Sequence, residues 1–353
     1  MDCLNRISED EHPMGRRAFL KLSGLLGLGV ASAWVIPGRA EAVKFDRNTH
    51  KVSETRLAMG TFVSMTLIHT SRDQAEEAMG RAFEEIERLT KLMNRFDSST
   101  AVGHLNQEGR IQDLPPEVVH VIENALLYNR RTGGAFDITV KPVVDLFRER
   151  MGGEKKALPT DRELKNLLQL IGSQKVELHG NSISFAAPGM GITLDGIAKG
   201  YIVDKASEVL ARHRVENHLI NGGGDIRTMG EKGDHKPWTI AIQDPWKKRD
   251  FPDRIALKNG AVATSGNYEV YYDREKMFHH IVDPATGHSP RVAASTSVLA
   301  PSAMQADALA TGVFVMSPAR GTEFINSLPD CASLIIDGKG NQIKSGAWKS
   351  TPA

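Results

Sequence analysis

Hydrophobic residues along this chain repeat with two different periods, which predicts a mixture of helices and strands. At residues 73–96 apolar side chains such as Ala75 and Met93 recur every three or four positions, as on one face of an amphipathic helix. At residues 56–70 apolar and polar positions alternate around a β-branched centre, as in a strand. The pattern therefore predicts a long helix at 73–96 and a strand at 56–70.

The remaining pattern predicts short elements of both kinds. Residues 43–54 are expected to form an extended arm. Further helices are expected at residues 115–131, 161–171 and 198–213, and strands at 176–186 (a hairpin), 192–195, 218–220, 238–243, 254–257, 261–264, 296–299, 332–336 and 342–344. These strands and helices do not alternate strictly, and this favours an α+β fold over a doubly wound parallel sheet.

A helix is also predicted from residue 302 onward, and it carries the most informative polar pair. Ser302 is a typical N-cap, and Asp307 and Thr311 are four residues apart, so they lie on one helix face. A carboxylate and a hydroxyl are hard oxygen ligands of the kind that Mg²⁺ prefers. The simpler alternative is an acidic residue favoured by the helix dipole and a threonine bonded to its own helix.

The first 42 residues are typical of an export signal. Arg16 and Arg17 form a twin-arginine pattern, an apolar run follows at 22–37, and residues 40–42 read Ala-Glu-Ala, a cleavage site. The run is short and glycine-rich for a membrane span, and an uncleaved anchor is the alternative. The sequence thus predicts a Tat signal peptide at 1–42, a mature domain at 43–353, and a periplasmic protein without a stable membrane anchor after processing.

Composition and charge exclude several functional classes. The chain has 353 residues, of which 41% are hydrophobic, and its net charge of +1 gives no reason to expect a nucleic acid or an anionic membrane as partner. One of its two cysteines, Cys3, lies in the signal segment. Cys331 is then left without an intrachain disulfide partner, and its apolar neighbours predict a buried side chain.

Glycine-rich and polar segments interrupt the regular elements at 58–61, 133–137, 195–201, 221–225 and 279–287. Glycines that join a strand to a helix, as in the third segment, expose backbone groups that can bind phosphate. Each segment alone is more often an ordinary turn, and a lone histidine such as His280 is more often structural. Neither a P-loop nor a zinc motif occurs after the signal segment.

Taken together, these segments resemble those of the ApbE family of FAD:protein FMN transferases. The resemblance runs from about residue 58 to residue 315. It rests on eight motifs in order: Met-Gly-Thr at 59–61, Met-Asn-Arg-Phe at 93–96, Gly-Gly-Ala-Phe-Asp-Ile at 133–138, Asp-Gly-Ile-Ala-Lys-Gly-Tyr at 195–201, Asn-Gly-Gly-Gly-Asp at 221–225, Thr-Ser-Gly-Asn-Tyr at 264–268, His-Ile-Val-Asp-Pro-Ala-Thr-Gly at 280–287 and Ala-Asp-Ala-Leu-Ala-Thr at 306–311.

The resemblance implies a single ApbE-like domain, related to the T-fold, with mixed sheets packed against helices. It also implies an enzyme that binds FAD and Mg²⁺, splits the pyrophosphate, transfers FMN to a Thr or Ser of a partner protein and releases AMP. Position by position, the resemblance implies metal ligands at Asp307, Thr311 and the carbonyls of Ala198 and Ala310, and a motif histidine at His280. It implies an FAD pocket formed by Met59, Phe96, Ala135, Phe136, Asp137, Asp195, Tyr201, His280 and Ile281.

The residue types fit this reaction, because displacement at phosphorus depends mainly on positioning and charge neutralisation. Lys199 or His280 could donate to the phosphates, and Asp307 or Asp283 could take the proton of the incoming hydroxyl. The chain departs from the family at 145–150, where charges replace an aromatic stretch. The expected acceptor is a protein of a membrane-associated electron-transfer complex; an FAD hydrolase and a non-catalytic flavin-binding accessory protein are the alternatives.

Overall fold

A computed structural model describes residues 41–44, 49–152, 157–247, 251–268 and 278–351. The twin-arginine segment lies outside the described residues. Within the described part of the chain, no helix combines the length and apolar character needed to cross a membrane.

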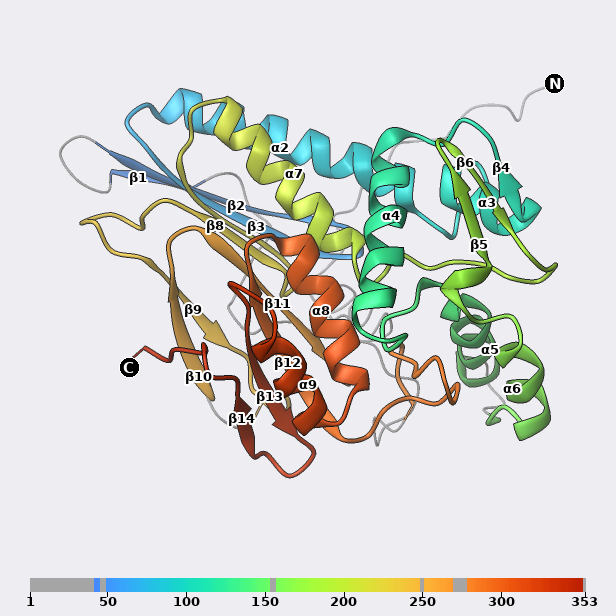
Figure 1. The fold of residues 1–353 in the computed structure, drawn as a ribbon. Helices are drawn as coiled ribbons and strands as arrows, with labels where there is room; N and C mark the ends of the chain where they lie inside the picture. The colour runs from blue at the N-terminus through green and yellow to red at the C-terminus, as the bar shows by residue number, and fades with distance from the viewer. Residues whose placement is uncertain (1–40, 45–48, 153–156, 248–250, 269–277, 352–353) are drawn as a thin grey trace, which may run out of the picture.

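One large antiparallel sheet organises the molecule (Figure 1). Its nine strands follow the order β1-β2-β3-β7-β8-β11-β12-β13-β14. They are β1 (Glu41–Lys44), β2 (His50–Ala58), β3 (Thr61–His69), β7 (Asn217–Gly222), β8 (Ile226–Met229), β11 (Gly260–Gly266), β12 (Ala293–Ala300), β13 (Ala332–Asp337) and β14 (Gln342–Lys344). Short turns join β2 to β3, β7 to β8 and β13 to β14, whereas longer segments with helices join β3 to β7 and β12 to β13.

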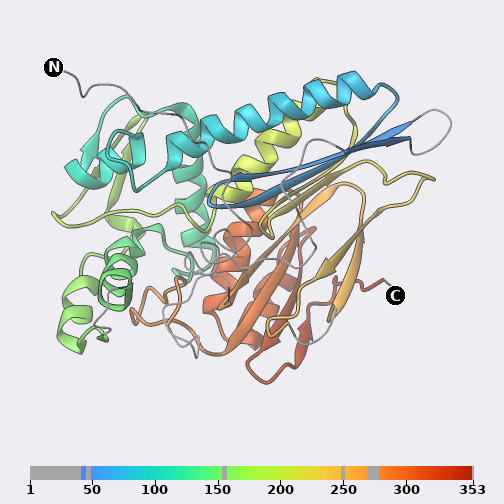
Figure 2. The ribbon, with the colours of Figure 1, turned by 180° about the vertical axis from the view of Figure 1, so that it is seen from behind.

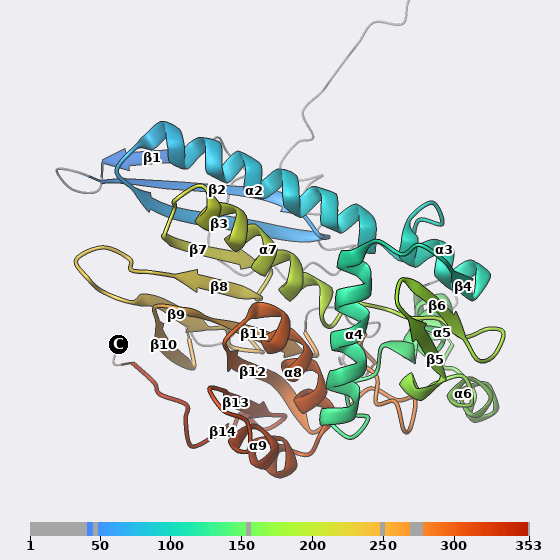
Figure 3. The ribbon, with the colours of Figure 1, turned by 45° about the horizontal axis from the view of Figure 1, so that its top comes forward.

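Helices cover one face of this sheet, and a two-stranded sheet covers part of the other face. The covering helices are α2 (Arg72–Met93), α7 (Ala198–Arg212), α8 (Ala303–Val315) and α9 (Pro318–Asn326), as Figure 3 shows. On the other face, seen from behind in Figure 2, lie β9 (Trp238–Ile242) and β10 (Asp253–Leu257). Apolar side chains fill both interfaces, which gives the sheet two buried faces.

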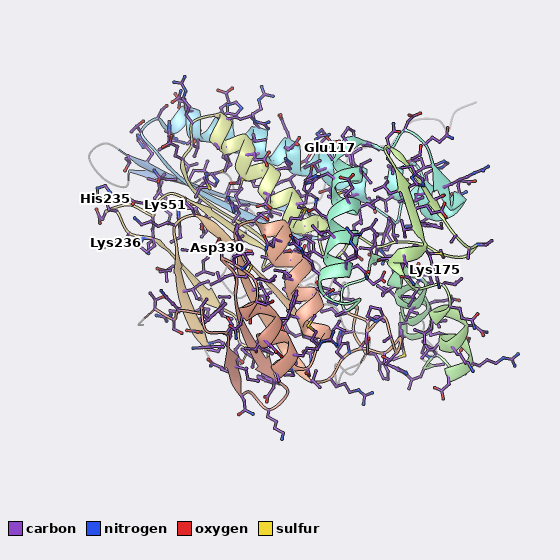
Figure 4. All side chains as sticks on the ribbon, viewed as in Figure 1. Lys51, Glu117, Lys175, His235, Lys236 and Asp330 are labelled. Carbon is purple, nitrogen blue, oxygen red and sulfur yellow. The ribbon has the colours of Figure 1, made fainter. Side chains whose placement is uncertain are left out.

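A smaller group of elements stands at one end of the sheet, beyond α4 (Pro116–Arg131) (Figure 1). It contains α3 (Ala101–Glu108), α5 (Lys141–Gly152), α6 (Asp161–Leu168) and a small sheet of β4 (Arg110–Ile111), β6 (Ser182–Phe185) and β5 (Val176–His179), with single 3-10 turns at Ile138–Val140 and Ser173–Lys175. Glu117, labelled at the N-terminal end of α4 in Figure 4, pairs with Arg88 of α2 at 2.7 Å. This contact joins α4 to the helical layer.

The mixed α+β architecture expected from the sequence is confirmed, and so are the helices at 73–96, 115–131, 161–171, 198–213 and 302–311 within a few residues. Ser302 caps α8, where its side chain accepts a hydrogen bond from the Gln305 amide. The prediction of the long helix is confirmed because its buried residues repeat at helical spacing along its whole length.

The strand predicted at 56–70 is confirmed over residues 61–69, but its start is wrong. The strand predicted at 56–70 is the end of β2, a tight turn and β3, with Ala58 paired to Thr61. Met59 and Gly60 form the turn with φ angles of 53° and 71°, the left-handed values that a two-residue hairpin turn requires. The glycine placed inside a strand is therefore a turn glycine. Within the arm expected at 43–54, residues 43–44 and 50–54 are paired in the sheet.

The strand predicted at 192–195 is also wrong, although its backbone is satisfied. Asn106 of α3 bonds both the amide and the carbonyl of Ile192, and the Thr193 amide donates to the Ile138 carbonyl. A side chain and a loop thus bond the backbone groups that a neighbouring strand would bond in a sheet. The sequence pattern also missed α3, α5, α9, β4 and β8, which are short or lack a clear period.

His218 gives the sheet a pH dependence that can be measured. Its ring is fully buried between Ser207, 2.7 Å from Nε2, and the Val215 carbonyl, 2.9 Å from Nδ1. Burial lowers the pKa of His218 from 6.5 to about 4. The folded state therefore binds this proton more weakly than the unfolded state, and stability is lost as the pH falls from 6.5 towards 4.

We expect this histidine alone to remove roughly 3 kcal/mol of unfolding free energy by pH 4, at ~1.4 kcal/mol per unit of pKa. Urea unfolding of the wild type and of His218→Gln between pH 7 and 4 measures the effect. The unfolding free energy of the variant should fall less steeply with decreasing pH than that of the wild type. The exposed His213, replaced by Gln, is the matched control and should leave the slope unchanged. Parallel slopes for wild type and His218→Gln would contradict the prediction.

Candidate active site

Asp307 lies at the contact between α7 and α8 and is almost fully buried, with 4% of its surface exposed. Its Oδ2 accepts a hydrogen bond from the Gly200 amide at 3.1 Å. Burial, and next the charge of Asp225, raise the pKa of the Asp307 carboxyl well above its ordinary value, while Lys199 and the Gly200 amide act in the opposite direction. A cation bound beside this buried carboxylate would offset the cost of its negative charge.

The N-terminus of α7 receives Asp307 because the helix has no cap of its own. Its N-cap residue, Ile197, makes no side-chain cap hydrogen bond, and Gly200 is the third residue of the helix. Asp307 therefore supplies the missing acceptor from another helix and interacts favourably with the helix dipole. The prediction that glycines expose free backbone here is corrected for Gly200, whose amide is already engaged.

Two glycines of α7 and its preceding turn allow this close approach. A Cβ on Gly200 would lie 2.2 Å from the Ala303 carbonyl oxygen of α8. A Cβ on Gly196 would lie 2.9 Å from Thr311 Oγ1 and 3.3 Å from the Phe136 ring. The glycines therefore bring the turn before α7 directly against Thr311, the second polar residue of α8.

Thr311 lies one helical turn after Asp307, on the face that meets strand β11. Its Oγ1 lies 3.2 Å from Ser265 Oγ, and either hydroxyl can donate. Ala310 precedes it and is fully buried, and Ala198, the first residue of α7, is 8% exposed. The structure thus brings Asp307 and Thr311 of α8 against the start of α7, where Ala198 is the first helical residue.

Lys199 and Asp225 form an ion pair beside Asp307. The distance from Lys199 Nζ to Asp225 Oδ2 is 2.8 Å, and Asp225 is 2% exposed. Asp225 comes from the turn after β7, whereas Lys199 is the second residue of α7. Two carboxylates and one ammonium group therefore share this part of the site, which leaves it with net negative charge.

In a second part of the site, Arg95 contacts both Asp195 and the Phe96 ring. The nearly buried Arg95 guanidinium contacts Asp195 at 3.2 Å and Asp145 at 2.8 Å, and it also lies 4.3 Å from the Phe96 ring centre. Arg148 lies over the same ring at 4.6 Å. A cavity of about 440 Å³ is lined by Arg95, Phe96, Lys141, Asp145, Arg148 and Glu149.

Phe136, Ala135 and Met59 also border the site. Phe136 packs against Gly196 and Gly312, beside Thr311, and Ala135 precedes it in the turn after α4. The Met59 methyl group reaches the end of β7, where a Cβ on Gly222 would lie 3.0 Å from it. Phe136 therefore lies beside Thr311 and Met59 lies at the end of β7, while the part of all three residues in an FAD pocket stays a prediction.

Asp137, Tyr201 and Ile281 are placed differently. Both oxygens of Asp137 accept hydrogen bonds from protein groups of Asn129, Thr139 and Ser173, so the carboxylate organises its own loop. The Tyr201 ring lies 5.7 Å from the His120 ring of α4, and Ile281 is buried in the main core. These contacts hold the three side chains within the fold, and their part in an FAD pocket stays a prediction.

His280 is positioned through its neighbour. The buried His279 ring packs edge-on against Phe314 of α8 at 5.5 Å, and the ring centres of His279 and His280 are 6.4 Å apart. His280 is half-exposed beside this end of α8. Asp283, in contrast, bonds the Ala285 amide and the Thr286 hydroxyl, so it forms the turn that the simpler alternative predicted and is a weak candidate for a base.

Three residues of this region were not singled out from the sequence: Arg95, Asp225 and Ser265. Each lay within a recognised motif, yet its role depends on a partner distant in sequence. Arg95 follows the C-cap of α2 and precedes the aromatic Phe96, and this local sequence gives no signal of its distant partners.

Comparison with known proteins agrees with this geometry. The sequence matches the ApbE family over residues 59–335. It is 34% identical to the FAD:protein FMN transferase of Haemophilus influenzae over 260 residues, covering 69% of this chain and 75% of that protein, and 33% identical to that of Vibrio cholerae over 272 residues, covering 75% and 81%.

Solved structures share the fold. A crystal structure of the ApbE protein of Thermotoga maritima superposes with a TM-score of 0.76 at 29% identity, over 84% of this chain and 97% of that one. The flavin transferase ApbE of Vibrio cholerae, solved as a histidine-to-glycine variant, superposes with a TM-score of 0.72 at 27% identity, over 84% and 98%. This chain belongs to the ApbE family.

Proposed function

We propose that this protein transfers FMN from FAD to a hydroxyl group of a partner protein and releases AMP. The observation that carries the proposal is the buried Asp307 carboxylate at the uncapped N-terminus of α7, one turn from Thr311, in a chain of the ApbE family. The relatives named above are FAD:protein FMN transferases, and this supports the same activity here.

The donor set fits a hard divalent cation. Asp307 offers a carboxylate, Thr311 a hydroxyl, and Ala198 and Ala310 offer backbone carbonyls, all oxygen donors of the kind that Mg²⁺ binds. The described residues contain no group of three His, Cys, Asp or Glu side chains around one point, so carbonyls and substrate oxygens would have to complete the ligand set. Mg²⁺ bound there would neutralise charge on the pyrophosphate.

The surrounding residues have separate tasks in this proposal. Lys199 donates to the pyrophosphate oxygens and stabilises the negative charge that develops towards AMP. His280 stands beside α8 and can donate to a phosphate oxygen or exchange a proton with the incoming hydroxyl. Gly196 keeps the space in front of Thr311 open, because a larger residue would contact Thr311 and Phe136.

A planar ring of the dinucleotide fits best against Phe96. This side chain is 61% exposed although it is aromatic, and it borders the 440 Å³ cavity next to Asp195. An exposed aromatic ring flanked by guanidinium groups is a suitable surface for stacking. Arg148 stands in the segment where the family's aromatic stretch is replaced, so in this chain a cation forms that wall.

The location and the acceptor follow from the sequence signal. We propose export by the Tat pathway and action in the periplasm, supported by the twin arginines at 16–17 and the cleavage site at 40–42. Its acceptor is then a protein outside the cytoplasm, of the class found in membrane-associated electron-transfer complexes.

One assay tests the activity. The mature protein is incubated with FAD, Mg²⁺ and an FMN-binding domain as acceptor, and the products are separated on a denaturing gel and by chromatography. We expect flavin fluorescence on the acceptor band and an equal amount of AMP, both lost when EDTA is added. Free FMN without labelled acceptor would instead indicate a hydrolase, and intact FAD would indicate a binding protein without this chemistry.

A further inference from the structure

The turn between β7 and β8 fixes Asp225 more firmly than an ordinary surface turn would. The Gly222 amide donates to the Asp225 carbonyl at 2.8 Å, and the Gly224 amide donates to the Asn221 side chain at 2.9 Å. Gly222 meets α7 so closely that a Cβ there would lie 2.8 Å from a Val203 methyl group. The Asp225 carboxylate is therefore anchored against α7.

The contact between Asp225 and Lys199 is asymmetric. Asp225 is 2% exposed, whereas the Lys199 side chain is 36% exposed. Asp225 Oδ2 accepts no well-aligned hydrogen bond, although Lys199 Nζ lies 2.8 Å away. A buried carboxylate is costly unless it is paired. The buried Asp225 carboxylate is therefore suited to anchor the partly exposed Lys199 ammonium group.

We propose that Asp225 is a positioning residue that holds the Lys199 ammonium group where it contacts the pyrophosphate of the substrate. An ammonium group has three N–H donors, so one can face Asp225 while the others face the substrate. The fixed carboxylate reduces the rotamer freedom that Lys199 would otherwise lose during the reaction. This inference rests on the proposed function, because it needs a phosphorylated substrate at the α7 N-terminus.

The test is a double-mutant cycle with Lys199→Met, Asp225→Asn and the double variant, in which Asn keeps the shape of Asp225. For FMN transfer we expect kcat to fall about a hundredfold for Lys199→Met and about tenfold for Asp225→Asn, with FAD affinity, measured by flavin fluorescence, changed less than about threefold. In the double variant kcat should equal that of Lys199→Met alone, because Asp225 acts through Lys199.

Multiplied losses in the double variant, or a kcat within twofold of wild type for Asp225→Asn, would overturn the proposal. The matched control is the ion pair between Lys205 and Glu208 of α7, at 2.9 Å and exposed, whose neutralising substitutions should leave kcat unchanged. Circular dichroism of each variant separates loss of fold from loss of positioning.

Thermal unfolding without FAD or Mg²⁺ tests the pair independently of the activity. Lys199→Met should lower Tm by at least about 5 °C because it leaves buried Asp225 unpaired, whereas Asp225→Asn should lower it by less than about 2 °C, and the double variant should recover. A double variant no more stable than Lys199→Met would overturn the pairing. Absence of transfer by the wild type would contradict the proposed function alone, and this unfolding cycle would still stand.

Discussion

Replacement of Asp307 by asparagine is expected to abolish FMN transfer while it leaves the protein folded. Asn keeps the shape and the acceptor for the Gly200 amide, but it removes the carboxylate that would hold the cation. Loss of a charged metal ligand removes several kcal/mol of transition-state stabilisation, so we expect at least about a thousandfold lower kcat. Raising Mg²⁺ should restore little of it, because a cation bound without the carboxylate would not be held in position beside the pyrophosphate.

The same substitution separates function from stability. Burial raises the pKa of Asp307, which means that the folded protein disfavours its negative charge. At neutral pH and without Mg²⁺, Asp307→Asn should therefore have a Tm equal to or above that of the wild type. Single-turnover rates and thermal unfolding measure the two effects.

A matched carboxylate lies on α7. Asp204 is also largely buried, with its pKa raised first by burial, and it accepts the Ala303 and Met304 amides at the start of α8. Asp204→Asn keeps an acceptor for one of these two amides and should retain transfer within about threefold. Turnover by Asp307→Asn within tenfold of the wild type would remove the metal-ligand role of Asp307.

Local signals explain which parts of the molecule were predictable. The N-cap at Ser302 and the helical spacing of Asp307 and Thr311 are written within a few consecutive residues, and the structure reproduces them. The turn at Met59 and Gly60 was missed because apolar alternation continues through it, although the hairpin at Gly180 was recognised from its glycine between alternating stretches. Short elements without a period, such as α3, gave no comparable signal.

Contacts between distant segments explain what could not be predicted. Gly200 and Asp307 are 107 positions apart, and Arg95 and Asp195 are 100 apart, so neither pairing has a trace in local spacing. The sequence suggested free backbone at Gly200, whereas the fold uses that amide to hold Asp307. The family resemblance supplied the residues of the site, and only the fold supplied the partners that orient them.

Replacement of Gly200 by alanine is expected to have the second large effect, this time on both stability and activity. The added Cβ would lie 2.2 Å from the Ala303 carbonyl oxygen, which is backbone and cannot turn aside. The two helices must then separate, which stretches the hydrogen bond from Gly200 to Asp307. We expect the unfolding free energy to fall by about 3 kcal/mol or more and FMN transfer to fall at least about tenfold.

Gly80 of α2 is the matched control, because it is also helical and a Cβ there would meet nothing within 4 Å. Gly80→Ala should raise the unfolding free energy by about 0.5–1 kcal/mol through helix propensity alone and leave transfer unchanged. The unfolding free energies of the two variants, measured with urea, therefore move in opposite directions, and the transfer rate falls for Gly200→Ala alone. If Gly200→Ala behaved like Gly80→Ala, the close crossing of α7 and α8 could not be what places Asp307 at the helix terminus.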